Sequence, residues 1–338
     1  MKELKIIRYM TNLYFIISAI IIIGGLLALL PHIIWLIIKI IGCFAHFNIA
    51  YKPFGYTAII LTSIWILLVL YGNTIGRFRY EIKKQEIKLQ NLPDEFNGYR
   101  IVHISDLHLN GWEGHANRLK KIVKEINSLD PDIICFTGDL VSTSAEEIKP
   151  FKEILSSLRA KDGIYSVMGN HDYIPYNHKL SENERWWAVE QVIKSEREEL
   201  GWDLLINENR VIHRGNDSIA ILGTENQSVG VLNVVQRADL LKTTQGTEGM
   251  FRILLTHDPS YWRNDIVNQT DIPLTLCGHT HAMQVRLFGI TPAKLFYPEC
   301  DGLYKEGNQQ LYVNIGLGGT LPLRIGATSE ITLITIYK

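Results

Sequence analysis

Two histidines placed two residues apart, His279 and His281, follow an apolar run in the 338-residue chain. The run covers residues 272–277 and is followed by a turn residue, Gly278. Because alternate residues of an extended chain point the same way, both imidazoles are expected to emerge together at the carboxyl end of a strand. Neutral imidazole is a common metal ligand, so this pair suggests a metal site.

Four other apolar runs also end in polar side chains. Each run is short, rich in β-branched or aromatic residues and bounded by turn residues, which is typical of a buried strand. Ligands of α/β proteins bind beyond the carboxyl ends of such strands. Five strands are therefore expected to bring carboxylates, imidazoles and an amide to one edge. The polar residues after the four runs are, in order, Asp106 with His108, Asp139, Asn170 with His171 and Asp172, and His257 with Asp258.

In this order, Asp-x-His, Gly-Asp, Gly-Asn-His-Asp, a lone His and Gly-His-x-His resemble the motifs of the calcineurin-like metallophosphoesterases. The resemblance covers roughly residues 98–338 and is strongest to the bacterial membrane-anchored phosphoesterase branch. One departure is Asn110, where the family usually has glycine; since Gly111 follows at once, a shifted turn is expected. The resemblance implies an α/β domain built as two mixed β-sheets sandwiched with outer helices, and a metal-dependent phosphoric ester hydrolase.

Hydrolysis of a phosphate ester needs a nucleophile at neutral pH and neutralisation of the phosphoryl charge, and two divalent ions meet both needs. Asp139 is the natural bridge, because one carboxylate can give an oxygen to each ion. The resemblance implies that Asp106, His108 and His281 complete the first ion site. It implies that Asn170, His257 and His279 complete the second. Oxygen and imidazole donors without thiolate favour Mn, Fe or Zn.

Three further residues are candidates for work on the substrate. In the family, the histidine that matches His171 protonates the leaving group, although contact with a phosphate oxygen is the competing account. Asp172 is expected to orient that ring, with a plain turn role as the alternative. Arg324 could hold a phosphate through two hydrogen bonds, with a surface or strand-pairing role as the alternative.

The amino-terminal part is predicted to be a transmembrane domain of about three helices within residues 1–75. The uncharged stretch 9–30 is long enough to cross a bilayer, and the apolar stretches 33–47 and 56–72 follow it. The alternative is two spans and an interfacial helix. Residues 76–97 are predicted to be a juxtamembrane linker or edge strand, and residues 98–338 the catalytic domain.

Basic residues flank this apolar part on both sides and bear on its orientation. Lys2, Lys5 and Arg8 precede it, and five more lysines and arginines lie within residues 77–88. The positive-inside rule would place both clusters in the cytoplasm, which three spans cannot satisfy. The larger second cluster favours a catalytic domain on the cytoplasmic side of a bacterial inner membrane.

Composition narrows the range of partners. A formal net charge of −1 argues against nucleic-acid binding, which usually requires a basic excess. The four cysteines lack Cys-x-x-Cys spacing and are expected to be free, buried thiols. In the second half of the chain, residues 209–213 and 218–222 are expected to form a hairpin. Residues 284–288, 310–315 and 331–337 are expected to be later strands.

The function expected from these features is hydrolysis of phosphodiester or pyrophosphate bonds at a membrane. A tethered site favours lipid-linked substrates such as UDP-diacylglucosamine. Trp112, Trp186 and Trp187 could contact a lipid or its headgroup, although core packing is the alternative for the last two. Two rival functions remain: hydrolysis of soluble esters by an enzyme that is merely anchored, and a metal-binding scaffold without turnover.

Overall fold

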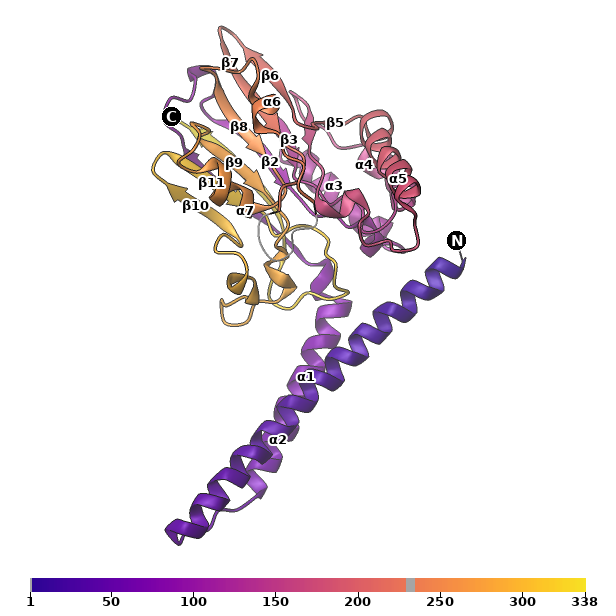
Figure 1. Cartoon of the computed structure of the whole chain (residues 1–338), viewed down its shortest axis with the longest axis vertical. Helices are drawn as coiled ribbons and strands as arrows, with labels where there is room; N and C mark the ends of the chain where they lie inside the picture. Colours follow the sequence, from indigo (N-terminus) through magenta and orange to yellow (C-terminus); the bar gives the residue numbers. More distant parts are fainter. Residues whose placement is uncertain (1, 229–234) are drawn as a thin grey trace. The chain divides into compact units, whose positions relative to one another are not determined.

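A computed structural model describes residues 2–228 and 235–338, and the chain divides into two compact units (Figure 1). The apolar-helix unit comprises Met1–Arg79 and Leu321–Gly326. The α/β unit comprises Tyr80–Thr320 and Ala327–Lys338. Residues 76–97, predicted to be a linker or an edge strand, are divided between the two units at Arg79 and Tyr80, and the late segment Leu321–Gly326 belongs with the helices.

The apolar-helix unit contains two long helices that lie side by side, α1 (Lys2–Ala45) and α2 (Lys52–Thr74). The prediction of three helices is wrong, because the stretches 9–30 and 33–47 form one continuous helix through Pro31. A proline removes one backbone hydrogen bond, which is a small loss in a helix of 44 residues that packs against a neighbour. By length and composition alone, Met10–Ala45 and Lys52–Phe78 could each cross a membrane.

The segment Leu321–Gly326 packs against these helices. Leu323 and Ile325 join a cluster with Ile16 of α1 and Val69 of α2. The backbone of Arg324 donates a hydrogen bond to the carbonyl of Gly72 at 3.1 Å. Apolar contacts and backbone pairing therefore tie this late segment to the amino-terminal helices.

The α/β unit begins with a six-stranded mixed sheet, called here the first sheet. Its outer strand β1 pairs in parallel with β12, β12 is antiparallel to β2, and the other neighbours are parallel. The edge strand expected near residues 78–89 is therefore present. In spatial order the strands are β1 (Tyr80–Lys88), β12 (Ser329–Tyr337), β2 (Tyr99–Ile104), β3 (Ile133–Phe136), β4 (Ile164–Ser166) and β5 (Asp203–Leu204).

A second six-stranded mixed sheet faces the first. Strands β11, β9, β8 and β7 run parallel, and antiparallel strands β10 and β6 close the two edges. The expected hairpin is present as β6 and β7. In spatial order the strands are β10 (Gly302–Glu306), β11 (Gln309–Val313), β9 (Leu274–Cys277), β8 (Phe251–Leu255), β7 (Asp217–Gly223) and β6 (Glu208–Arg214).

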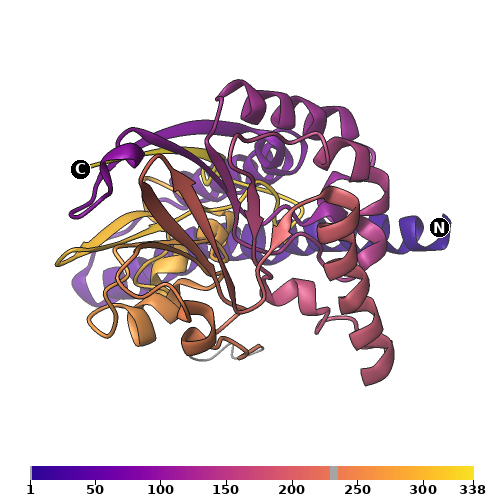
Figure 2. The same ribbon diagram turned by 90° about the horizontal axis from the view of Figure 1, so that it is seen from above.

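One apolar core joins the inner faces of the two sheets. It contains Ile101 and Ile133 of the first sheet and Ile219, Ile253 and Leu274 of the second. Helices cover the outer faces (Figure 2). They are α3 (Ala116–Ser128), α4 (Lys152–Leu155) and α5 (Glu182–Lys194) beside the first sheet, and α6 (Leu240–Thr244) and α7 (Pro259–Tyr261) beside the second. The expected two-sheet sandwich is confirmed.

The strand expected at residues 284–288 is absent from the described structure. A 3₁₀ turn covers His281–Gln284, and Leu287 pairs only with Ile290, in an isolated bridge. Phe288 is fully exposed. The apolar residues of this stretch therefore do not enter the core, although their spacing resembles that of a strand.

Candidate metal centre

The ends of five strands, three from the first sheet and two from the second, meet at one site. Residues after β2, β3 and β4 supply Asp106, His108, Asp139 and Asn170. Residues after β8 and β9 supply the three histidines His257, His279 and His281. Face-to-face packing of the sheets is therefore what brings the two sets of ligand types together.

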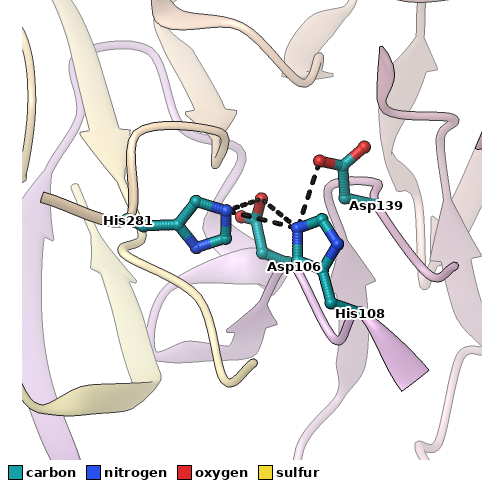
Figure 3. Close-up of side chains that lie close together, drawn as sticks. All are labelled: Asp106, His108, Asp139 and His281. Carbon is teal, nitrogen blue, oxygen red and sulfur yellow. Dashed lines mark hydrogen bonds and ion pairs between the residues drawn. The ribbon is translucent and has the colours of Figure 1, made fainter. Parts of the chain in front are cut away.

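Asp106, His108, Asp139 and His281 form the first group, and their side chains point toward one another (Figure 3). One nitrogen or oxygen atom from each lies within 4.8 Å of the others. His108 Nε2 is 3.4 Å from Asp139 Oδ2, and His281 Nε2 is 3.4 Å from Asp106 Oδ1. All four are buried. Converging oxygen and nitrogen donors at this spacing suit a divalent cation.

Asp139, His257 and His279 form a second group within the same 4.8 Å limit. His257 Nε2 is 3.3 Å from Asp139 Oδ2, and His279 Nδ1 is 3.2 Å from His257 Nε2. Asp139 therefore belongs to both groups. This is the arrangement that a bridging carboxylate requires.

Asn170 fits the second group through an atom that lacks a partner. Its Oδ1 is buried and accepts no hydrogen bond within the described residues, while its Nδ2 donates to Tyr176 Oη at 3.0 Å. Leaving a buried acceptor unsatisfied costs free energy, so such atoms are rare unless something binds them. A cation in the second group would satisfy this oxygen.

The backbone around the site is held in an uncommon conformation. Asp106, His108, Asp139, His279 and His281 all have positive φ angles, of 53°, 44°, 60°, 75° and 50°. Non-glycine residues adopt this region at a cost, and such strain gathers at functional sites. The turns are also packed so tightly that a Cβ atom on Gly169 or Gly278 would collide with Asp139 or Asp106.

Burial and mutual charge set the pKa values of the ligands. Burial raises the pKa of Asp106 to about 6 and lowers that of His108 to about 4. Burial also acts on Asp139, but the neighbouring His257 and His171 outweigh it and hold the pKa of that carboxyl well below its ordinary value. Asp139 is therefore the carboxylate best disposed to stay ionised, as a ligand must.

The ligand rings are fixed by hydrogen bonds from their other nitrogens, as is usual for metal-binding histidines. His257 Nδ1 lies 2.6 Å from the carbonyl oxygen of Thr137. His279 Nε2 lies 2.8 Å from Tyr297 Oη. Tyr297 was not predicted as part of the site, because it lies beyond the last ligand on a separate turn.

His171 lies beside the first group. Its ring packs edge-on against the ring of His108, with centroids 4.8 Å apart. Its Nδ1 is 2.9 Å from the carbonyl oxygen of Ser142, and its backbone N–H donates to Asp139 Oδ1 at 2.8 Å. The imidazole is thus held at the metal centre by a partner, Ser142, that the sequence did not indicate.

Asp172 does not orient that ring. Its fully buried carboxylate accepts hydrogen bonds from the backbone N–H groups of Asp139 and Gly169, both at 2.8 Å, and of Val141 at 3.0 Å. The prediction for Asp172 is therefore corrected: the carboxylate fastens the turns that carry Asp139 and Asn170. The backbone N–H groups of these adjacent tight turns need acceptors. This explains why the Asp172 carboxylate binds the backbone and not the imidazole of His171.

Arg324 belongs to the apolar-helix unit, and its predicted contact with phosphate stays a prediction. Trp112 is buried and donates from Nε1 to the carbonyl of Leu107 at 2.9 Å, so it supports the Asp106 turn and does not face lipid. Trp186 and Trp187 are exposed. Of the cysteines, Cys43 is exposed and the other three are buried; all four are free.

A buried carboxylate behind the site was also missed. Glu330 of β12 forms an ion pair with Lys83 of β1 and accepts a hydrogen bond from the N–H of Ile315 at 3.3 Å. Its own N–H donates to the carbonyl of Gly316 at 3.3 Å. Gly318 in turn donates to the carbonyl of Asp106 at 2.7 Å. Glu330 therefore supports the loop on which the Asp106 turn rests.

Comparison with known proteins gives consistent results. The sequence model of the Metallophos family, described as calcineurin-like phosphoesterase, matches residues 99–283. A Danio rerio protein named "Transmembrane protein with metallophosphoesterase domain" is 31% identical over 290 residues, covering 83% of this chain and 62% of that protein. This chain thus spans less than two thirds of that relative.

Two bacterial relatives are covered more fully. The Bacillus subtilis (strain 168) protein named "Uncharacterized metallophosphoesterase YkuE" is 31% identical over 283 residues, covering 78% of this chain and 90% of that protein. The Chlamydia trachomatis serovar D protein named "UDP-2,3-diacylglucosamine pyrophosphatase LpxG" is 29% identical over 288 residues, covering 72% of this chain and 86% of that protein.

Proposed function

Because the chain belongs to the calcineurin-like phosphoesterases, we propose that it is a membrane-anchored dinuclear-metal hydrolase of phosphodiester or pyrophosphate bonds in lipid-linked substrates. The observation that carries the proposal is the place of Asp139, which is common to two groups of potential metal ligands. None of the expected ligand types is missing. A metal-binding scaffold without turnover would need the same ligands, so the assay for cleavage below is what separates it from an enzyme.

Asp106, His108, Asp139 and His281 would hold one ion, and Asn170, His257 and His279 would join Asp139 around the other. Two bound divalent cations would supply an acidified water and positive charge beside the phosphoryl oxygens. Donors of oxygen and imidazole type suit Mn, Fe or Zn. The chain's own part is to fix these donors, through Asp172 and the strained turns, before substrate arrives.

His171 would complete the reaction as the general acid. Its Nδ1 faces the Ser142 carbonyl, so Nε2 is the ring atom that would carry a transferable proton to the leaving oxygen. Contact between the rings of His171 and His108 keeps His171 beside the first ligand group, where the phosphate of a bound substrate would lie. Protonation matters most for a leaving group that is a poor anion.

Membrane anchoring is supported by the two long apolar helices and by the printed name of the Danio rerio relative. Two spans return the chain to the side from which it began. The basic residues that precede and follow the apolar part then lie on one side, which resolves the conflict that three spans create. The positive-inside rule places that side, and the α/β unit with it, in the cytoplasm.

A lipid-linked substrate is supported by the printed name of the Chlamydia relative and by the effect of tethering, which raises the local concentration of the site toward anything in the same bilayer. UDP-diacylglucosamine is the first candidate. The alternative is that the helices only localise an enzyme with soluble substrates.

The test uses the full-length protein in phospholipid vesicles, with UDP-diacylglucosamine in the bilayer or bis-nitrophenyl phosphate in solution. We expect metal-dependent cleavage of both, and a higher kcat/KM for the lipid. Cleavage of the soluble diester alone would remove the lipid substrate from the proposal. If neither compound is cleaved with Mn, Fe or Zn, the proposed catalytic activity is wrong.

A further inference from the structure

The stretch between the last metal ligand and β10 presents apolar side chains to solvent. We call residues 283–298 the apolar loop. Its six exposed large apolar residues are Met283 (42% exposed), Leu287 (39%), Phe288 (102%), Ile290 (71%), Leu295 (82%) and Phe296 (61%). Single exposed apolar residues are ordinary, but a contiguous group marks a surface that binds something.

The loop is built to present these side chains. Leu287 and Ile290 exchange two backbone hydrogen bonds of 2.9 Å around a tight turn, which places Phe288 at its tip with a φ of 52°. A bulky residue in this left-handed region is strained. The chain thus holds an aromatic ring in a strained conformation and buries none of it. Such strain at an exposed position indicates a function.

The loop is also fixed at its base to the metal centre. Thr291 Oγ1 donates to the carbonyl of Ala282 at 2.6 Å, next to the ligand His281. Tyr297 Oη lies 2.8 Å from Nε2 of the ligand His279. Both ends of the loop are therefore fixed to residues at or next to ligands of the candidate metal centre.

The charge of the loop narrows the choice of occupant. None of the residues 283–298 is acidic. Arg286 forms an ion pair with Asp301, and Lys294 is basic and exposed. Exposed apolar side chains with basic neighbours suit the boundary between hydrocarbon and anionic headgroups. The same chain carries two helices long and apolar enough to cross a membrane, so a bilayer is covalently within reach.

We propose that the apolar loop inserts into the hydrocarbon of the bilayer and holds the metal centre against the phosphates of membrane lipids. The proposal rests on the membrane anchoring proposed above. It extends that proposal by making the α/β unit itself a membrane-binding surface. Phe288, Ile290, Leu295 and Phe296 enter the acyl region, and Lys294 meets headgroups.

The test places a fluorescent label at the loop tip of the full-length protein. Cys43 is the exposed thiol and the other three are buried, so Cys43→Ser provides a background for labelling. Phe288→Cys in this background carries a polarity-sensitive dye. The matched control is Leu241→Cys, a position that is also largely exposed (87%) and lies on α6, which packs against the edge strand β6 of the second sheet.

Both labelled proteins are reconstituted into phosphatidylcholine and phosphatidylglycerol vesicles that contain acyl-chain nitroxide lipids. We expect a blue-shifted emission at position 288 and at least about threefold stronger quenching there than at position 241. Equal quenching at the two positions, or energy transfer between loops of two copies without lipid quenching, would overturn the proposal.

Sedimentation with the vesicles separates the two proposals. If the protein stays in the supernatant, the membrane anchor itself is wrong and the loop proposal falls with it. If the protein sediments and the label at 288 still faces water, only the loop proposal is wrong. Neither reading depends on whether a lipid is cleaved.

Discussion

The metal centre and the apolar loop both depart from the usual pattern, in which charged side chains are exposed and apolar side chains are buried. They depart from it in opposite ways. At the metal centre, Asp106, His108 and Asp139 are ionisable and buried. Only a few residues beyond the ligand His281, Phe288 and Leu295 are apolar and almost wholly exposed. Each arrangement is unfavourable for the isolated chain. Each would become favourable with the occupant proposed for it, a pair of cations in one case and hydrocarbon in the other.

The two regions also share a means of construction. Both hold non-glycine residues at positive φ, and both are fixed by hydrogen bonds from neighbouring turns. The protein thus maintains each surface before the occupant binds. An unfavourable burial pattern together with backbone strain therefore marks a binding surface. This holds for buried polar groups, as at the metal centre, and for exposed apolar groups, as in the apolar loop.

The largest expected effect is at the residue common to both ligand groups. Asp139→Asn should lower kcat for bis-nitrophenyl phosphate by at least about 10³-fold, because one substitution weakens both ion sites. Circular dichroism should show a folded protein. Activity within tenfold of wild type at saturating Mn would separate Asp139 from the chemistry.

Loss of His171 should depend on the leaving group. With His171→Ala, kcat/KM for an alkyl phosphodiester should fall about 10²–10⁴-fold, because its leaving alkoxide needs a proton. Nitrophenyl esters should lose less than about tenfold, since nitrophenolate leaves without one. Equal losses on both would assign the ring to phosphate binding.

A smaller effect is expected behind the metal centre. Glu330→Gln should weaken Mn binding about 10–100-fold, because the loop under the Asp106 turn loses its ionic support. Glu86→Gln, an exposed carboxylate on the adjacent strand β1, is the matched control and should leave the affinity unchanged. Isothermal titration of both variants decides the matter. Unchanged Mn affinity in Glu330→Gln would show that the loop under the Asp106 turn keeps its conformation without this carboxylate.

The smallest effect is expected in the apolar loop when no bilayer is present. Leu295→Ser with Phe296→Ser should change the stability of the detergent-solubilised protein by less than about 0.5 kcal/mol, because neither side chain is buried. Ile253→Ala in the core should cost about 2–5 kcal/mol. Thermal unfolding measures both. A core-sized loss from the serine variant would mean that the loop packs against the protein.

Much of the metal centre could be predicted because its ligands directly follow apolar strands. Each motif indicates by itself that its polar residue lies at the end of a strand. These residues are Asp106, Asp139, Asn170, His257 and His279. The two-sheet sandwich was implied by the family resemblance, and the strand pattern agreed with it. Contacts between distant turns left no such local signal. Neither the backbone clamp of Asp172 nor the bond between Tyr297 and His279 could be read from spacing.

Two errors have one physical cause. The prediction of separate helices over residues 9–30 and 33–47 and the prediction of a strand over residues 284–288 both assume that the local pattern decides the outcome. Packing against α2 outweighs the loss of a hydrogen bond at Pro31. In the apolar loop, apolar and polar residues alternate as they do in a strand, but the apolar side chains are exposed and do not pack in the core. A hydropathy pattern shows which residues are apolar. It does not show whether the protein core or a lipid bilayer covers them.

The proposed place of Asp139 between two metal ions can be examined by titrating the metal-free full-length protein with Mn²⁺ and recording electron paramagnetic resonance spectra. We expect two ions per chain with a magnetically coupled spectrum in the wild type, and only the spectrum of isolated Mn²⁺ in Asp139→Asn. A single ion per wild-type chain, or a coupled pair that survives in Asp139→Asn, would contradict it.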